Sequence, residues 1–482
     1  MKNFFPLIIT IFLVGTMNAQ DSGQDKKWTL QECVAYALEN NISIQQAELD
    51  SENAALDKLD AFGNLIPAVN ANATNSWNTG LTQNVTTGVL QTQTTRNFSA
   101  GISASVTLFD GLRNFKQFQR AKLAKLATQY SLDKIKDDIS LAVANNFLQI
   151  LLNKRNLEVV VSQNEVTKEQ LDRTQELVDG GVLPKGDLLE IRAQDANEQQ
   201  SIVASENAVQ ISLISLAQLL RVEDYKNFDI SDDEYLIMGD EILDYTPTEI
   251  VASAKENRKE IKIAEMNAEL AQKDIEIARG SSWPTLSAFV NYNTRESGAG
   301  QYLDPIIDPD EPTREIGFVE STGDVVVSPN TLSTIGKPLP FFDQLYLNDG
   351  INYGFQLNVP LFNGFAVRNQ INRSRVNAKS AELNLEQTKL DLESSVYQAY
   401  LDARSARKAY EAAEVAAEAQ ELAYEYAKDR YDVGLTNAFD FSQSKQRYDN
   451  AQIELNRSKY DYIFRIKVVE LYFGIPISEI KF

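Results

Sequence analysis

The residues that could do chemistry are almost all acidic. The 482-residue chain holds 68 Asp and Glu residues, 46 Lys and Arg residues, one cysteine and no histidine. Without histidine, no imidazole can activate a serine or cysteine, and the commonest metal ligand is missing. Hydrolysis by two carboxylates stays open in principle, but no Asp/Glu pair stands out along the charged segments. We therefore expect no enzyme activity, no cofactor and no metal site.

The net charge of −22 narrows the class of partner. Nucleic acids and anionic lipid surfaces are bound by clustered Lys and Arg, so we expect no nucleic acid partner. Cations suit an acidic chain better than these anionic partners do. Cys33 is the only cysteine, so an exported form of this chain cannot form an internal disulfide. A buried apolar role for Cys33 is one reading, and a reactive thiol is the other.

The N-terminus has the pattern of an export signal. One Lys is followed by an apolar run from about Phe4 to Val14 and by Ala19, a small residue suited to cleavage. The alternative, a short membrane anchor, needs about 18–20 apolar residues to span a bilayer. We predict a signal peptide at residues 1–19, and no apolar run long enough for a membrane helix after it.

One six-residue motif, called the junction below, occurs twice in the sequence. VTLFDG at Val106–Gly111 returns as VPLFNG at Val359–Gly364, 253 residues later. The same offset aligns the glycine-containing turns downstream, whereas an offset of 217 aligns the segments upstream, Pro67 with Pro284 among them. The chain is therefore predicted to be two copies of one unit, with an insert of about 36 residues in the second copy.

Each junction precedes a very long helix. No Gly or Pro occurs from Leu112 to Asp179 or from Phe365 to Val433, which allows rods of about 100 Å. Seven-residue spacing links Val143 to Ile150 and continues to Val178, and Val396 starts the same series in the second copy. Such a sustained heptad pattern predicts coiled-coil packing.

The segments before each junction alternate with a period of two. In INYGFQLNVPLF, from Ile351 to Phe362, every second residue is apolar, and the residues between them are mostly polar or small. A soluble sheet with one wet face would show this pattern too. Strands of nine to eleven residues with an apolar face, however, suit a tilted span of a bilayer. Four such strands cannot close a barrel alone, so several chains must share one, and the pattern does not fix how many.

The junction residues have roles that follow from their types. An Asp or Asn can cap the helix, a Gly permits the sharp turn, and a Pro ends one element before the next strand. These predicted junction residues are Pro67, Asp110, Gly111, Pro284, Asn363 and Gly364.

Taken together, the duplicated unit, the LFDG and LFNG junctions and the turn sequences VDGGVLPKGD and YDVGLTNAFD resemble the TolC family of outer-membrane efflux proteins. The resemblance covers nearly the whole mature chain. It implies a mainly α fold with a membrane β-barrel: a homotrimer whose shared twelve-stranded barrel lies in the outer membrane, above a coiled-coil α-helical tunnel in the periplasm. It also implies a passive exit channel that works with a periplasmic adaptor and an inner-membrane pump, and contacts with outer-membrane lipid.

The resemblance assigns roles at the turns between the long helices. Adaptor docking falls on the tip residues Gly181, Val182, Leu183, Gly434, Leu435 and Thr436. Asp440 falls at an entrance ring that would favour cations, and Tyr431 and Asp187 at bonds that hold the entrance shut. An arginine that helps to lock the entrance in some members of the family would fall at Thr436 and is absent here. The plainer alternatives are packing for Tyr431 and helix capping for Asp187 and Asp440.

Several alternatives stay open. The 294–350 segment is either a tolerated surface loop or a plug or receptor surface. The whole chain is either an export duct or a structural coiled-coil spacer of the envelope, and the cargo is not specified. The predicted organisation is a signal peptide at 1–19, a first repeat at 20–220 with strands at about 67–77 and 97–109, an acidic linker at 221–247, a second repeat at 248–473 with strands at about 284–293 and 351–362, and a tail at 474–482.

Overall fold

The structure, a computed structural model, describes residues 27–83, 89–232, 237–298, 303–335 and 338–475. The signal peptide predicted at 1–19 lies outside the described residues, as does most of the predicted tail. The chain divides into two compact units. The helical unit contains Met1–Asp50, Gln129–Ile263 and Glu386–Phe482, and the sheet unit contains Ser51–Thr128 and Ala264–Leu385. Each repeat contributes to both units, so the units do not coincide with the repeats.

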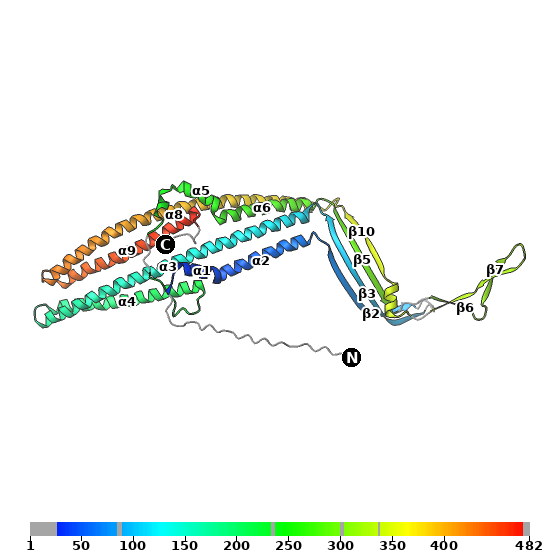
Figure 1. Ribbon diagram of the computed structural model, residues 1–482, viewed down its shortest axis with the longest axis horizontal. Helices are drawn as coiled ribbons and strands as arrows, with labels where there is room; N and C mark the ends of the chain where they lie inside the picture. Colours follow the sequence, from blue (N-terminus) through cyan, green and yellow to red (C-terminus); the bar gives the residue numbers. More distant parts are fainter. Residues whose placement is uncertain (1–26, 84–88, 233–236, 299–302, 336–337, 476–482) are drawn as a thin grey trace, which may run out of the picture. The chain divides into compact units, whose positions relative to one another are not determined.

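The two repeats fold into the same helices with the same lengths (Figure 1). The first-repeat helices are α1 (Leu30–Asn40), α2 (Ile42–Gly63), α3 (Arg113–Asp179) and α4 (Lys185–Leu220). Their second-repeat counterparts are α5 (Pro247–Asn257), α6 (Lys259–Gly280), α8 (Ala366–Asp432) and α9 (Ala438–Phe473). Within each pair the lengths agree, at 11, 22, 67 and 36 residues. The predicted duplication and the long helices are thus seen directly.

The first helix of each repeat starts with the same device. Thr29 caps α1 and Thr246 caps α5, each accepting a hydrogen bond from a backbone N–H three residues later. In turn, the carboxylate of Glu32 accepts from the backbone N–H of Thr29, and that of Glu249 accepts from the backbone N–H of Thr246. These capping boxes satisfy donors that the helix leaves unpaired, so two Thr-x-x-Glu sequences fix where each repeat begins.

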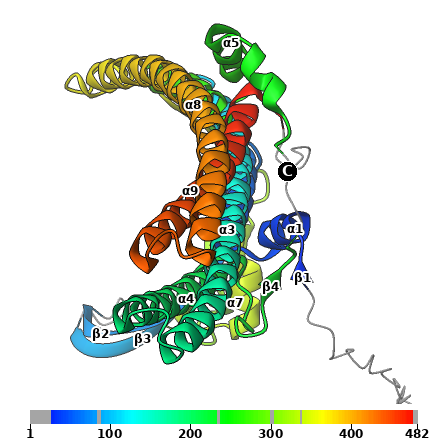
Figure 2. The same ribbon diagram turned by 90° about the vertical axis from the view of Figure 1, so that its left-hand side faces the viewer.

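The helical unit contains two main hydrophobic cores. One is built mostly by the first repeat, with Tyr460 and Ile463 of α9 added, and the other by the second repeat. Figure 2 shows α8 and α9 running side by side, and α3 and α4 do the same. The buried Val143 and Ile150 of the first core are replaced by Val396 and Ala403 at the same heptad positions of the second. Cys33 is completely buried on α1, and its counterpart on α5 is Ile250, so Cys33 occupies an apolar position. Short elements complete these cores, namely β1 (Lys27–Trp28), β4 (Asp229–Ile230) and the 3₁₀ helix η1 (Asp240–Asp244).

Helix α4 corrects one expectation. By length and composition alone it is the one described helix apolar enough to cross a membrane, where the sequence was expected to contain none. Its apolar C-terminal half, however, places Leu213, Leu216 and Leu220 in the first core. Packing in that core accounts for part of the apolar composition of α4, whereas Val203, Ile211 and Ile214 on the same helix stay exposed.

The sheet unit contains one antiparallel sheet in the order β10-β5-β3-β2. Its strands are β2 (Ala68–Gln83), β3 (Leu90–Phe109), β5 (Thr285–Ser297) and β10 (Gly350–Asn358). The strands of the first repeat are longer than predicted, because polar pairs such as Thr79 and Thr94, with hydroxyl oxygens 2.8 Å apart, extend the ladder beyond the alternating region.

The other two strand ends also differ from prediction. Strand β5 continues four residues past the predicted end at 293, to Ser297, because it stays paired with β3. Strand β10 was expected to reach residue 362 but ends at Asn358. Pro360, which has no N–H for a ladder, stands where β3 has Thr107.

The second-repeat insert forms its own small elements. Strand β6 (Leu303–Ile307) pairs with β9 (Thr331–Ile335), and β7 (Thr313–Phe318) pairs with β8 (Val325–Pro329). Helix α7 (Phe341–Leu347) then returns the chain to β10. The predicted loop at 294–350 is therefore two β-ribbons and a short helix.

Candidate functional site

The sheet has one strongly apolar face. Ladder pairing places Ile351 and Tyr353 of β10, Val290 and Tyr292 of β5, and Ile102 of β3 on the same side. Tyr353 is 76% exposed and its neighbour Phe355 is 74% exposed. An apolar face of this size that stays uncovered in a single chain indicates contact with lipid or with another protein.

The apolar face has the height of a bilayer core. Leu286 and Glu296 lie ten positions apart on β5, which corresponds to about 25 Å for a rise of about 3.3 Å per residue and a tilt of about 40°. At the Glu296 end, the apolar face is bordered by an ion pair between Arg96 and Glu296, with a nitrogen–oxygen distance of 2.8 Å. Phe341 of α7 packs on Phe98 and beneath the Arg96 guanidinium, so α7 covers this charged end of the face.

The first junction is closely packed. Asp110 is 5% exposed and caps α3, since its carboxylate accepts from the backbone N–H of Asn114 at 2.9 Å. Gly111 has φ +72°, and Leu112 after it has φ +63°. A Cβ on Gly111 would lie 2.4 Å from the carbonyl oxygen of Gly280, so only glycine fits there.

The second junction has the same backbone without the packing. Gly364 and Phe365 have φ of +61° and +66°. No heavy atom within the described chain would lie within 4 Å of a Cβ on Gly364. The backbone carbonyl of Asn363 accepts from Ala366 at 3.2 Å, and no bond of the Asn363 side chain to α8 is seen in the described residues. The predicted side-chain cap is therefore present at Asp110 and not at Asn363.

The prolines mark the change from helix to strand, whereas the two junctions mark the change from strand to helix. Pro67 and Pro284 each occupy the last position before a strand, β2 and β5 respectively. In each repeat the helix before the proline ends in tight turns, with Ile66 donating to Gly63 and Trp283 donating to Gly280. The two prolines therefore mark where helix becomes strand.

The two turns between the long helices share one geometry. Gly181 and Gly434 have φ of +75° and +74°. The next residue in each turn, Val182 or Leu435, donates its N–H back into the last turn of the preceding helix at 2.8 Å, and each of these apolar side chains is 70% exposed. Leu183 and Thr436 follow them. Each turn thus presents an apolar residue at its tip.

Neither aspartate beside the turns is the helix-capping residue. Asn437 caps α9, because its side-chain oxygen accepts from the N–H of Asp440 at 2.8 Å. Asp440 is exposed, and its carboxylate accepts from the side chains of Thr436 and Asn437 at 3.3 Å. At α4 the capping position is Pro184, with Asp187 in the first turn. The capping alternative for Asp187 and Asp440 is therefore wrong.

Tyr431 lies between the helix pairs and bonds to an unpredicted residue. Its hydroxyl oxygen is 3.0 Å from that of Thr174 on α3, and its ring stacks on Phe441 of α9 at 5.0 Å. Burial raises the pKa of Tyr431, the bond to Thr174 opposes this, and the nearby Asp187 raises it further. Asp187 is thus near Tyr431, but the hydrogen bond within the described chain is to Thr174.

An ion pair lies beside Tyr431. Arg173 of α3 donates to the Asp432 carboxylate of α8 at 2.7 Å and to the backbone carbonyl of Asp432 at 3.3 Å. Together with Thr174 and Tyr431 it links α3 to α8 next to the tips. This ion pair was not predicted, because both residues lie on charged faces 259 positions apart.

A buried charged cluster links α4 and α9. Lys445 is 2% exposed and donates to Glu198 at 2.7 Å, and it also pairs with Asp449 at 3.5 Å. Asn164 of α3 donates to Glu198 at 3.3 Å. Burial raises the pKa of Asp449 to about 6; Lys445 opposes the shift and Glu198 adds to it. This cluster was not predicted either.

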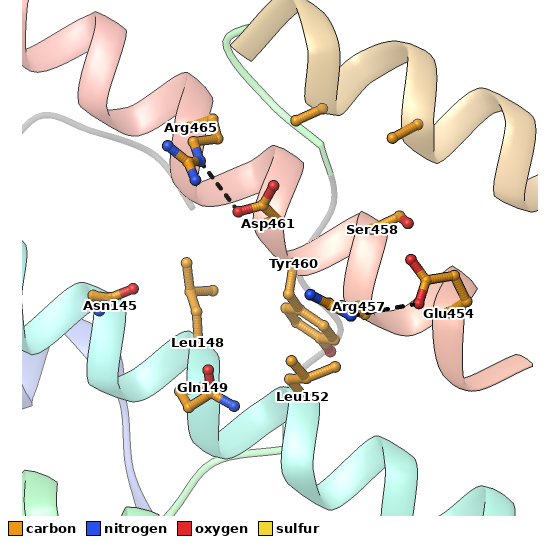
Figure 3. A pocket seen from close by; sticks show the side chains of 12 residues that line it. Asn145, Leu148, Gln149, Leu152, Glu454, Arg457, Ser458, Tyr460, Asp461 and Arg465 are labelled. Carbon is orange, nitrogen blue, oxygen red and sulfur yellow. Dashed lines mark hydrogen bonds and ion pairs between the residues drawn. The ribbon is translucent and has the colours of Figure 1, made fainter. Parts of the chain in front are cut away.

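A cleft of about 430 Å³ lies between α3 and α9, with two alanines of α8 at its edge (Figure 3). Arg465 pairs with Asp461 on its own helix and with Asp402 of α8, and Arg457 pairs with Glu454. None of the predicted site residues lines the cleft. Within the described residues no group of three or more His, Cys, Asp or Glu side chains could hold a metal ion.

Comparisons with known proteins agree with this architecture. The Outer membrane efflux protein family matches residues 34–220 and 250–465. Protein CyaE of Bordetella pertussis is 22% identical over 319 residues, which is 66% of this chain and 58% of that protein. The chain therefore spans less than two thirds of the curated relative that it matches.

Solved structures share the fold. The CmeC outer membrane channel of Campylobacter jejuni superposes with a TM-score of 0.72 at 18% identity, covering 93% of this chain and 86% of CmeC. The outer membrane protein VceC of Vibrio cholerae gives a TM-score of 0.70 at 14% identity, covering 92% and 96%. Two repeats, long paired helices and a four-stranded sheet are thus a known fold, as predicted. Because the family matches most of both repeats, the chain belongs to the outer membrane efflux protein family, a family of outer-membrane channels rather than enzymes.

Proposed function

We propose that three copies of this chain form a passive exit channel in the outer membrane, as part of a tripartite efflux or type I secretion system. One observation carries the proposal: a four-stranded sheet with an apolar face and two unpaired edges continues into 67-residue helices. Open edges cannot remain in lipid, so the sheet has to be closed by other copies. Three copies supply twelve strands, an even number within the range of outer-membrane barrels.

The apolar tips fit docking of a periplasmic adaptor, which would in turn connect an inner-membrane pump. The exposed Val182 and Leu435 occupy equivalent places in two turns of one backbone geometry. A partner that covers one turn could cover the other in the same way, with Gly181, Leu183, Gly434 and Thr436 around the contact. Six such tips in a trimer would offer six similar apolar sites.

At the entrance, Asp440 is the residue proposed to select cations. It is exposed in the first turn of α9, and its carboxylate is not neutralised by a cation within the described residues. Three copies about one axis would concentrate cations there. Tyr431, with Asp187 nearby, would hold the entrance narrow, and the Arg173–Asp432 pair would act in place of the family's missing arginine.

A structural spacer is the alternative function. A spacer has no need for an apolar face about 25 Å high, or for α7 to cover the charged end of that face. Lining the exterior of a membrane barrel gives both features a purpose, which favours the channel.

The test is single-channel current in a planar bilayer, before and after a trivalent cation is added on the tip side. We expect small, steady, cation-selective steps that the cation blocks, and loss of the block in Asp440→Asn. Tyr431→Phe with Arg173→Ala should enlarge the steps if the entrance is latched there. A folded, inserted oligomer that stays silent even with these two latch substitutions would favour the spacer.

A further inference from the structure

We propose that the second-repeat insert binds an extended, basic segment of another protein, which adds as a third strand along β8 and β9. The two β-ribbons of the insert, β6–β9 and β7–β8, follow each other and form one long hairpin at residues 303–335, called the arm below (Figure 1). The arm lies wholly within the sheet unit. The proposal concerns this arm alone and does not depend on whether the barrel conducts.

The arm has one irregular leg and one regular leg. Between the two ribbons, the carbonyl oxygen of Asn330 accepts from the N–H of Asp308 at 2.8 Å, and the N–H of Asn330 donates to Pro312 at 3.0 Å. Asn330 alone connects β8 to β9, whereas the five residues 308–312 connect β6 to β7. The Asp308 carboxylate accepts from two backbone N–H groups within this connection, at 2.9 and 3.2 Å. The irregularity is therefore confined to the β6–β7 leg, and β8 and β9 form a nearly continuous backbone edge.

The outer edges of the two legs also differ in sequence. The β6–β7 leg, residues 303–318, contains three prolines, six charged residues and a bulge between Glu315 and Gly317. Charges, prolines and bulges are the features by which natural sheets prevent pairing at an edge. The β8–β9 leg, residues 325–335, contains no charged residue and one proline, Pro329, and most of its other residues favour strands. The first edge is therefore blocked against another strand, and the second is open.

The open edge has no partner strand within the described chain. There, β8 pairs only with β7 and β9 only with β6, and the side chains of Val325, Val327 and Leu332 are exposed. A two-stranded hairpin is marginally stable in water, and independent stability usually needs at least three strands. A strand added along β8 and β9 would bond the free backbone groups of this edge, which is how many domains bind extended peptides.

The charge of the arm indicates which kind of strand it binds. Residues 303–324 include seven acidic residues and a single basic one, Arg314. Neighbouring strands lie about 5 Å apart, so a strand added beside β8 would lie about 10 Å from Glu315 and the rest of the acidic leg. That distance is close to the Debye length in physiological salt. A strand rich in Lys or Arg would therefore be attracted, and an acidic strand would be repelled.

A second copy of the arm fits the open edge less well. Pairing between two β8–β9 edges is an isologous contact that joins two copies, so it would leave one arm unpaired in a ring of three. It would also bring two acidic arms together. The occupant that fits both the edge and the charge is a basic segment of a different polypeptide.

Hydrogen exchange of the full chain in detergent locates the added strand. The probe is an acetylated peptide of alternating Lys and Val, and its control is the same peptide with every backbone nitrogen methylated. The unmethylated peptide should slow amide exchange at least about tenfold, with the strongest protection at residues 325–335. A peptide of alternating Glu and Val should give no protection. Stronger protection of residues 303–318, equal protection by the methylated peptide, or no protection at all would overturn the proposal.

Substitutions on the two legs test the edge separately, with the affinity of the Lys–Val peptide measured by fluorescence anisotropy. Val326→Lys adds a repelling charge to the open edge and should weaken binding at least about tenfold. Ile316→Lys adds the same charge to the blocked leg and is the matched control, since both side chains are exposed; it should weaken binding less than about threefold. Val326→Glu disturbs β8 as much but attracts the peptide, so its affinity should not fall. Equal weakening by Val326→Lys and either of the other two variants would contradict the proposal.

Other occupants would be recognised by the same exchange measurement. Protection of residues 325–335 that rises with protein concentration without peptide would identify a second copy. Protection by vesicles of phosphatidylethanolamine and lipopolysaccharide, but not by the peptide, would identify a lipid surface. Either result would reject the proposal. Single-channel current is recorded without peptide, so a silent protein whose arm binds the peptide would keep the arm and reject the channel, and a conducting protein whose arm binds nothing would do the reverse.

Discussion

The two repeats share their helix lengths, caps and turn geometry, yet equivalent surfaces meet different surroundings. Gly111 is packed against Gly280, whereas Gly364 is open. Lys445 is buried, whereas its first-repeat counterpart, Arg192, is exposed. Duplication therefore gives two copies of the same backbone. The copies differ in which equivalent positions are buried within the chain and which stay exposed and free to contact a partner.

The largest expected effect is at the buried charge. Lys445→Met leaves Glu198 buried without its cation, which should lower the free energy of unfolding by about 3–5 kcal/mol. Arg192→Met changes the equivalent exposed residue and should stay within about 0.5 kcal/mol. Denaturant unfolding in detergent compares the two variants. Similar losses in both would mean that the cluster does not distinguish the repeats.

Substitution by alanine should affect the two junction glycines differently. Gly111→Ala places a Cβ 2.4 Å from the Gly280 carbonyl oxygen in a left-handed conformation, and should destabilise the folded chain by about 3 kcal/mol. Gly364→Ala meets no atom of its own chain, so only the strain of the left-handed backbone remains, and the loss should be about 1 kcal/mol. Denaturant unfolding in detergent compares the two variants. Equal losses in both would mean that the contact with Gly280 does not distinguish the junctions.

A pH effect comes from Asp449. Because its pKa is raised to about 6, the carboxyl is neutral at low pH, and its charged form costs stability as the pH rises through about 6. That cost is at most about 3 kcal/mol near pH 7. Asp449→Asn should remove this fall, giving a flatter stability profile between pH 4 and 7. An unchanged profile in the variant would show that the titration lies elsewhere.

The smallest effect separates the two turns. Asn437→Ala removes the side-chain cap of α9 and should cost about 1 kcal/mol. Pro184→Ala removes no side-chain cap from α4 and should change stability by less than about 0.5 kcal/mol. Thermal unfolding of both variants is the measurement, and equal losses would mean that capping does not explain the difference.

Much of the fold could be predicted because the repeated signals are local. The long segments without Gly or Pro and the paired junction glycines each act through neighbours in sequence. The cluster of Glu198 and Lys445 could not be found this way, because the partners are 247 positions apart on helices rich in charge.

The candidate site was predicted less completely than the fold. The side chain that bonds Tyr431 is Thr174, and the cap beside Asp440 is Asn437. Which side chain bonds Tyr431 depends on how neighbouring helices face each other, and heptad spacing does not determine this. The end of β10 was predictable in hindsight from Pro360, but the alternating pattern outweighed it.

The most direct test of the central claim combines assembly with conduction. Gln356→Cys on β10 and Thr74→Cys on β2 place thiols on the two edge strands of the sheet and would link the assembled copies. The linked trimers would be purified, and their single-channel current compared before and after reduction. The account predicts the same cation-selective current in both states, because the disulfide would join strands that are already neighbours in the barrel wall. Linked trimers that are silent, while the reduced protein conducts, would contradict it.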